Sequence, residues 1–238
     1  MIRDMTRGNV TRHLVGFSVP IILGNLFQLA YNAVDSIVVG RFAGTGALAA
    51  VGTANPVMNI IILGVSGLCI GASVLMSEYF GARDTEKLRR EFAATLFLGL
   101  FFSAAVLALG LPLAGPLLRL LNVPDEIFPQ ARAYLCIIFL GMPFTFVYNA
   151  YAAAMRSVGD SRTPIRFLAL ASVLNAGLDV AFVAGLHWGA VGAGIATVLA
   201  ESLSAILCVI YTERNLAALR LTLSLIHISE PTRLQLIS

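Results

Sequence analysis

The stretch from Val19 to Gly40 is the feature that most limits what this chain can fold into. It reads VPIILGNLFQLAYNAVDSIVVG, which is long and apolar enough for a helix that crosses a bilayer. It also carries one acidic residue, Asp35. A charge at the centre of a membrane helix costs about 2.5–3.5 kcal/mol on insertion scales, so an acid there needs a partner or a function. The stretch predicts a membrane helix that contributes to a polar site.

The composition extends this prediction to the whole chain. Of 238 residues, 58% are hydrophobic and 12% are charged, whereas a soluble domain has about 25% charged residues. Lipid tails give apolar helices no hydrophobic reason to associate, so close packing of small residues and polar contacts must hold them together. The 21 glycines suit that role. We expect a protein that spans the membrane several times.

Six apolar runs are long enough to span a bilayer, which takes about 20 residues each. Gly44, Gly46 and Gly52 are expected in a loop between the first two runs. The sequence predicts an all-α, polytopic bundle of six transmembrane helices in one unit over residues 1–220. The predicted spans are about 14–40, 55–80, 92–118, 131–155, 165–186 and 190–211.

The distribution of Lys and Arg predicts the orientation, because cytoplasmic segments carry an excess of both. With the N-terminus inside, twelve lie in inner segments and three in outer ones. We therefore expect both ends of this unit in the cytoplasm and the spans in the inner (plasma) membrane. The three outer ones are Arg41, Arg119 and Arg132.

A second acid, Asp179, lies in another predicted span, and both acids lie six residues from the outer end of their span. At 1.5 Å per residue, both lie about 9 Å below that end. Thr197 is expected at a similar depth on the sixth span. Other polar residues follow or precede these by three or four positions and so share their helix faces; they are Asn32, Asn175 and Glu201. The matched depths predict one site shared by three helices.

The predicted site offers oxygen atoms, which suit a hard cation such as Na⁺. Two close carboxyl groups in a medium of low dielectric constant also retain a proton readily. The alternative is that each acid is neutral and only fixes helix packing. Glu201 could join the site, face a water-filled cavity or serve packing. Pro20 could let the first helix bend, and Gln28, Tyr31 and Asn149 could line a cavity or bond between helices.

The chain lacks the sequence patterns of enzymes and of nucleotide-binding proteins. It has no phosphate-binding loop, nucleophile elbow or zinc-binding helix, and Asp179 lacks the Gly-x-Gly-Asp setting of intramembrane proteases. We expect no enzymatic activity, no cofactor beyond a coupling ion and no nucleic-acid partner.

Four stretches in this order carry a family resemblance: SVPIILGNLFQLAYNAVDSIVVGRFAG, RSVGDSRTP, LNAGLDVAF and GAVGAGIATVLA. Together they resemble the MATE family of multidrug and toxic compound extrusion transporters, and most closely its DinF-like prokaryotic branch. The resemblance covers about residues 10–220. It implies one six-helix lobe, the N-terminal one, of a twelve-helix fold whose two lobes face a central cavity.

The resemblance also implies a function, the Na⁺- or H⁺-coupled export of small organic, often cationic drugs. The cation ligands of the family match Asp35, Asn175, Asp179 and Thr197, and its helix-bending proline matches Pro20. Glu201 departs from the family pattern, because an uncharged residue is expected there. The substrate cavity implied by the resemblance is lined by Gln28, Tyr31, Asn32, Tyr134 and Asn149.

Two readings compete with a drug antiporter. One is a flippase of related fold for lipid-linked precursors, which would favour a more cationic cavity. The other is a membrane fragment that does not transport, since one lobe lacks the opposite wall of the cavity. Residues 221–238 include LSLIHISEPTR, which resembles a translated sequencing adapter. The sequence thus predicts a truncated half-transporter with a non-native tail.

Overall fold

The computed structural model describes residues 10–221, which form six long helices and no strand. The fifth helix continues without a break into a π-helical turn, η1, and a short 3₁₀ turn, η2, follows the sixth. The bounds are α1 Val10–Phe42, α2 Gly44–Gly81, α3 Thr85–Leu120, α4 Phe128–Ser157, α5 Arg162–Asp179, η1 Val180–Gly185, α6 Gly189–Asn215 and η2 Ala217–Leu219.

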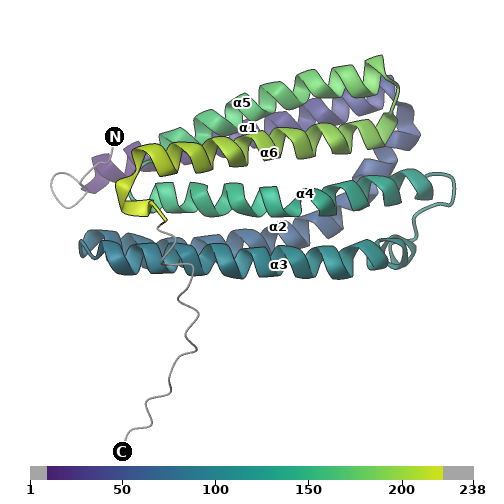
Figure 1. Ribbon diagram of the computed structural model, residues 1–238. Helices are drawn as coiled ribbons and strands as arrows, with labels where there is room; N and C mark the ends of the chain where they lie inside the picture. The colour runs from purple at the N-terminus through teal and green to yellow at the C-terminus, as the bar shows by residue number, and fades with distance from the viewer. Residues whose placement is uncertain (1–9, 222–238) are drawn as a thin grey trace, which may run out of the picture.

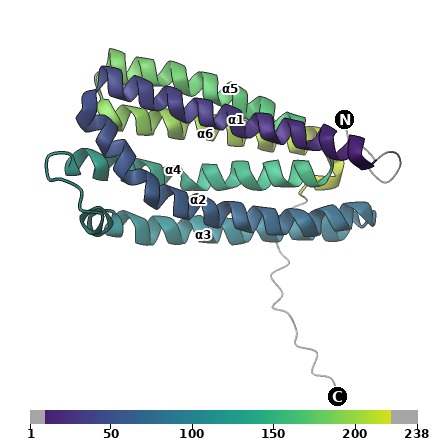
Figure 2. The same ribbon diagram turned by 180° about the vertical axis from the view of Figure 1, so that it is seen from behind.

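The helices lie in two layers that run along a common axis (Figures 1 and 2). One layer holds α1, α5 and α6, and the other holds α2, α3 and α4. The layers meet mainly where α4 packs against α6. The two ends of the described chain lie at the same end of the bundle, as an even number of spans requires (Figure 1).

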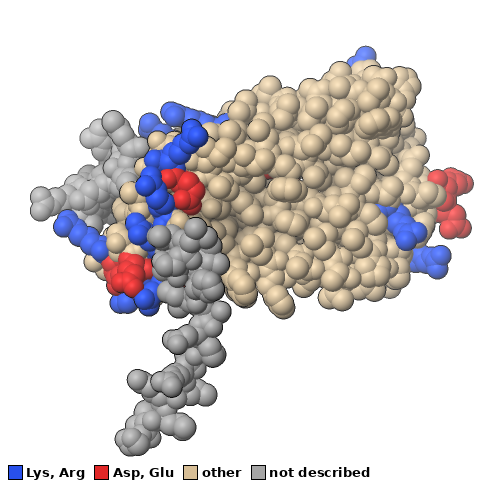
Figure 3. Space-filling view, in the orientation of Figure 1, with Lys and Arg blue, Asp and Glu red and all other residues tan. Residues whose placement is uncertain are grey.

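The outer surface of the bundle is suited to lipid. Six helices are long and apolar enough to cross a membrane, and large apolar side chains point outward, including Phe97 at 74% and Val173 at 73% exposure. Figure 3 shows charged side chains at the two ends of the bundle and an uncharged middle on the face drawn. The prediction of an all-α, multi-pass membrane bundle is confirmed.

The predicted loop between the first two spans is wrong. In the structure α1 ends at Phe42 and α2 begins at Gly44, so one residue separates the two helices. Gly44 has a φ of +84°, a backbone conformation that favours glycine. Gly46 and Gly52 lie inside α2, whose first turns bury one face of small residues, Ala47, Ala50, Val51 and Ala54. Packing of that face outweighs the weak helix propensity of glycine. Figure 2 shows α2 changing direction along its length, and Pro56 lies inside it.

Glycines allow the helices to approach closely in the core, as the composition predicts. A Cβ added at Gly99 of α3 would lie 1.6 Å from Cζ of Phe146 on α4. At Gly110 it would lie 2.9 Å from the ring of Phe139. At Gly141 of α4 it would lie 2.6 Å from Val198 on α6. The last of these close contacts sets the spacing of α4 and α6, and the site depends on that spacing.

Candidate functional site

Two aspartates from different helices meet in the interior of the bundle. Asp35 of α1 is 9% exposed and Asp179 at the end of α5 is 0% exposed. Their carboxyl groups lie within hydrogen-bonding reach of each other. Among the described residues, neither forms an ion pair with a basic side chain, and Oδ1 of each has no hydrogen-bond partner. Two acids without a cation between them are costly at this depth unless they bind a proton or a cation.

Asn175 ties this pair to α6. With its amide oriented to satisfy its neighbours, the nitrogen donates to Oδ2 of Asp179 over 2.8 Å, and the oxygen accepts from the backbone N–H of Thr197 over 3.1 Å. Asn175 is 1% exposed and lies one turn before Asp179 on α5. In this arrangement it orients Asp179, and its oxygen would have to turn to become an ion ligand.

The helix changes its winding at the site. α5 is α-helical up to Asp179, and the next six residues, Val180–Gly185, form the π-helical turn η1. π-helical turns widen a helix locally and occur often at functional sites. The turn is packed by the ring of Phe182, which stacks on Trp188 with centroids 5.3 Å apart. The second acid thus lies where the regular backbone of α5 ends.

Tyr134 of α4 is within electrostatic reach of all three interior acids, Asp35, Asp179 and Glu201. It is 7% exposed. Gly194 of α6 admits its ring, because a Cβ there would lie 3.2 Å from Cδ2 of Tyr134. Its proximity to all three acids makes this tyrosine the shared neighbour of two polar groups in the lobe.

Glu201 makes its contact on α4 and not with the aspartate pair. Its Oε2 is hydrogen-bonded to Oγ1 of Thr145. The expectation that Glu201 shares a helix face with Thr197 is compatible with this, since both lie on α6, but the carboxyl group points to another neighbour. Thr145 is absent from the residues predicted from sequence. Its position four residues before Asn149, on the same helix face, is the signal that could have found it.

The remaining predicted residues are distributed as follows. The Asn149 amide donates to the backbone oxygen of Thr145 over 2.8 Å, so it bonds within its own helix. The side chains of Gln28 and Asn32 are exposed on α1. Pro20 and Tyr31 lie within α1, but their side chains are outside the described part of the chain, as are residues 222–238 of the predicted tail.

The residues present fit either a proton or a small hard cation. The aspartate pair supplies two buried oxygen atoms without hydrogen-bond partners among the described residues. The ligand atoms available there are carboxyl and amide oxygens, which suit Na⁺ better than a transition metal. Among residues 10–221 no group of three His, Cys, Asp or Glu side chains forms a metal site. The geometry thus favours a site with one exchangeable cation.

Comparison with known proteins identifies the family. The MatE family model matches residues 20–181. The chain belongs to the MatE family. A MatE relative, the probable multidrug resistance protein YpnP of Bacillus subtilis, is 35% identical over 201 residues, which are 84% of this chain and 45% of YpnP.

Solved structures of transporters agree with the fold. The crystal structure of a MATE protein in its bent conformation matches with a TM-score of 0.85 and 29% identity, over 91% of this chain and 48% of that one. A transporter of the MOP superfamily from Pyrococcus furiosus matches with a TM-score of 0.83 and 29% identity, over 92% and 48%. For that protein, a binding pocket of reverse polarity is said to suggest a different function. The chain spans about half the length of the relatives it matches, consistent with one lobe of a MatE transporter.

Proposed function

We propose that this chain is one lobe of a cation-coupled antiporter that exports small organic, cationic compounds, with H⁺ or Na⁺ as the coupling ion. The observation that carries the proposal is the buried Asp35–Asp179 pair, which has oxygen atoms without partners and no basic neighbour in an ion pair among the described residues. Intramembrane acids of this kind mark ion and proton pathways. The names of the relatives, multidrug resistance and export proteins, supply the class of substrate.

The geometry suggests how ion binding changes the shape of the lobe. With the site empty and both acids ionised, like charges on α1 and α5 repel each other at short range in a poorly screened interior. A proton or Na⁺ between the two carboxyl groups removes the repulsion and draws α1 toward α5. Asn175 donates to Asp179 and accepts from the backbone of α6, so it ties Asp179 to α6. Binding therefore biases the position of α1, where Pro20 provides a point of bending.

The membrane potential adds a driving force to this step. A charge that crosses 100 mV gains about 2.3 kcal/mol before any concentration term. The excess of Lys and Arg in the segments assigned to the inside, twelve against three, supports an orientation with the described ends in the cytoplasm. In that orientation the aspartates lie in the outer half of the membrane, and the external solution loads them.

A drug-binding cavity between two lobes needs a second lobe as its opposite wall. The chain covers about half of its relatives, and a central cavity lies between two lobes in the fold that the sequence resembles. We expect a second six-helix lobe as partner, and we expect the chain by itself to insert in a membrane and transport nothing. The groups we assign to the cavity are acidic or neutral, which favours organic cations over the anionic headgroups that a flippase would carry.

The test is drug efflux by the lobe joined to the second half of the Bacillus subtilis relative, once that fusion transports. Asp35→Asn keeps the size of the side chain and removes its charge. We expect gradient-driven efflux to fall at least tenfold, because the pair can no longer exchange a cation. Asp125→Asn, which removes an exposed acid between α3 and α4, is the matched control. Unchanged gradient-driven efflux by Asp35→Asn would exclude the coupling role.

A further inference from the structure

Glu201 is the third acid in the interior, and the aspartate site does not use it. It lies on α6, partly buried, and its carboxyl group is hydrogen-bonded to the Thr145 hydroxyl of α4. The close contact between Gly141 and Val198 holds the two helices near each other at the same level. Glu201 therefore has a fixed partner on a helix that contributes neither aspartate.

The hydroxyl of Thr145 has two acceptors within reach. Its Oγ1 also lies 3.4 Å from the backbone oxygen of Gly141. A hydroxyl has one hydrogen to donate. If Thr145 donates to Gly141, the Glu201 carboxyl group must be the donor and must carry a proton. If Thr145 donates to Glu201, the carboxyl group is an acceptor and can be ionised. A rotation of one hydroxyl thus accommodates both protonation states without moving a helix.

No cation in the described residues compensates Glu201. It forms no ion pair, and Glu78 is the only charged residue of α2, which also packs on α6. The interior acids of α1 and α5 are Asp35 and Asp179, and Tyr134 and Tyr148 of α4 lie within electrostatic reach of Glu201. Arg156 of α4 lies near Tyr148 and Cys208. It is eleven residues, or about 16 Å along the helix, from Thr145, and it forms no ion pair with Glu201 among the described residues. A carboxylate in such surroundings is costly, and a bound proton removes the cost.

The α6 face that carries Glu201 is polar toward the end of the bundle where the described chain ends. Ser204 is 2% exposed and Thr212 is 0% exposed, and within residues 10–221 neither hydroxyl has a hydrogen-bond partner. Glu201, Ser204, Cys208 and Thr212 recur at helical spacing on one face, on which Cys208 packs in an apolar cluster and the other three are polar. Buried polar groups that lack a protein partner are the groups that ordered water typically bonds. Glu201 thus has polar neighbours that a purely structural bond between two helices does not need.

We propose that Glu201 is a second proton-binding site of this lobe, separate from the aspartate pair, with Thr145 as the residue that positions it. The proposal rests on the proposed function in that it adds a proton to the same transport cycle. The proton comes from a hydronium ion of the solution, which becomes a water molecule. The carboxylate of Glu201 takes the proton up and becomes a neutral carboxyl group, and the Thr145 hydroxyl turns from Glu201 to the Gly141 carbonyl.

The experiment is infrared difference spectroscopy of the whole chain in lipid vesicles, stepped from alkaline to neutral pH. A protonated carboxyl group has a carbonyl band of its own. We expect one such band at neutral pH to be lost in Glu201→Gln, which keeps the size of the side chain and an acceptor for Thr145. The band must persist in the double variant Asp35→Asn, Asp179→Asn. Thr145→Val should shift the band, and Thr145→Ser should restore its position, because the serine keeps the hydroxyl.

Two results would overturn the proposal. One is a spectrum of Glu201→Gln identical to that of the unsubstituted chain, since Glu201 would then be ionised at neutral pH. The other is a band that disappears when the organic cation tetraphenylphosphonium is added, since Glu201 would then be a carboxylate site for substrate. The measurement needs no transport, so loss of coupled efflux in Asp35→Asn and failure of this proposal can be told apart.

Discussion

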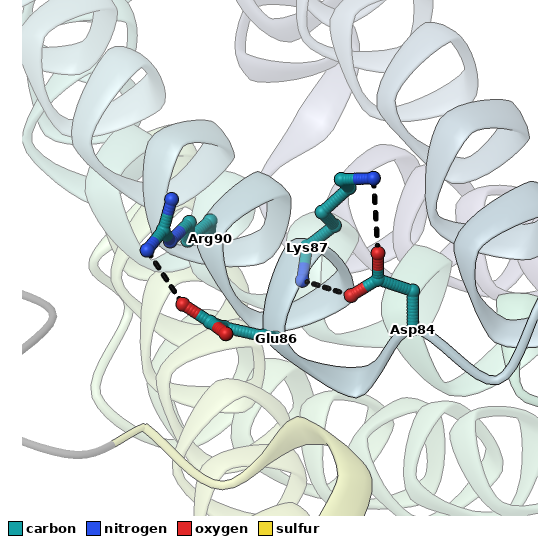
Figure 4. A network of polar contacts seen from close by, with 4 residues as sticks. All are labelled: Asp84, Glu86, Lys87 and Arg90. Carbon is teal, nitrogen blue, oxygen red and sulfur yellow. Dashed lines mark hydrogen bonds and ion pairs between the residues drawn. The ribbon is translucent and has the colours of Figure 1, made fainter.

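The acids at the ends of the bundle and the acids in its interior are satisfied in opposite ways. At the start of α3, Asp84 accepts the backbone N–H of Lys87 over 3.0 Å and pairs with its ammonium group over 3.0 Å. Glu86 pairs with Arg90 over 2.5 Å (Figure 4). In the interior, Asp35, Asp179 and Glu201 contact carboxyl, amide and hydroxyl groups, and none of them pairs with a described basic residue.

Asp160 shows that burial alone does not cause this difference. It is 5% exposed, yet Oδ1 accepts the backbone N–H of Thr163 over 3.1 Å, and Oδ2 accepts the Thr163 hydroxyl over 2.7 Å. Tyr211 of α6 also donates to it over 3.4 Å. A buried aspartate can thus be fully bonded in this fold. Asp179, by contrast, keeps an oxygen without a hydrogen-bond partner among the described residues, which supports the proposed ion site.

The strongest test of this contrast exchanges the two buried aspartates for neutral residues. Asp160→Ala removes the acceptor of the Thr163 N–H at the start of α5, a bond of the helix-capping kind worth about 0.5–2 kcal/mol. It also leaves the hydroxyl groups of Thr163 and Tyr211 without this acceptor, at about 1–3 kcal/mol. We expect the free energy of unfolding to fall by about 1.5–5 kcal/mol in all. Asp179→Asn should leave it the same or raise it, because a like-charge neighbour is removed. Unfolding of the chain in mixed detergent micelles measures both.

The contrast has a clear point of failure. Equal destabilisation by the two substitutions would mean that Asp179 is a structural residue like Asp160, and the ion site would lose its main support. Asp160→Asn is the matched control for size, since asparagine also caps helices. It should recover much of the stability that alanine loses.

A smaller loss of stability is expected from a substitution at Gly141, the glycine that lets α4 and α6 approach each other beside Thr145 and Glu201. Gly141→Ala places a Cβ 2.6 Å from Val198, so α4 and α6 must separate beside the bond between Thr145 and Glu201. Overpacking of this kind costs about 1–3 kcal/mol. Gly67→Ala is the control, because no other described residue has an atom within 4 Å of a Cβ added there, and alanine at this position should stabilise α2. The same micelle unfolding compares them, and equal effects would show that the spacing of α4 and α6 is not fixed by Gly141.

The sequence was informative about the fold because length and hydropathy dominate in a membrane. Six apolar runs predict six helices, and the family follows from ordered stretches such as LNAGLDVAF. Helix ends were less predictable. The glycines at 44, 46 and 52 suggested a loop, whereas only Gly44 has the backbone conformation of a break. Burial of alanines around Gly46 and Gly52 decides that boundary, and burial depends on neighbours distant in sequence.

Prediction of the site had a similar limit. Helix depth alone placed Asp35, Asp179 and Thr197 at one level, and the structure brings the two aspartates together and links Asn175 to Thr197. Depth says nothing about which way a side chain turns about the helix axis. Glu201 therefore looked like a neighbour of the same site, while the rotation of α6 directs it to Thr145 of α4. Its role as a second site needs the packing of α4 on α6, which no spacing in the sequence reveals.

The smallest effect on stability is expected for the acid Asp84, which lies at an end of the bundle. The backbone N–H of Lys87 and then its ammonium group hold the pKa of this carboxyl group below its usual value of 3.8. A group whose pKa is lower in the folded state stabilises the fold above its unfolded pKa, and this contribution is lost as the pH falls through the folded value. Asp84→Asn keeps the cap and removes the charge. We therefore expect the small stability difference between the chain and this variant to vanish in strong acid and to shrink with added salt. If the stability difference between the chain and Asp84→Asn does not change with pH or salt, the charge of Asp84 contributes nothing to stability. The acid at this end of the bundle would then stabilise the fold by its hydrogen bonds alone.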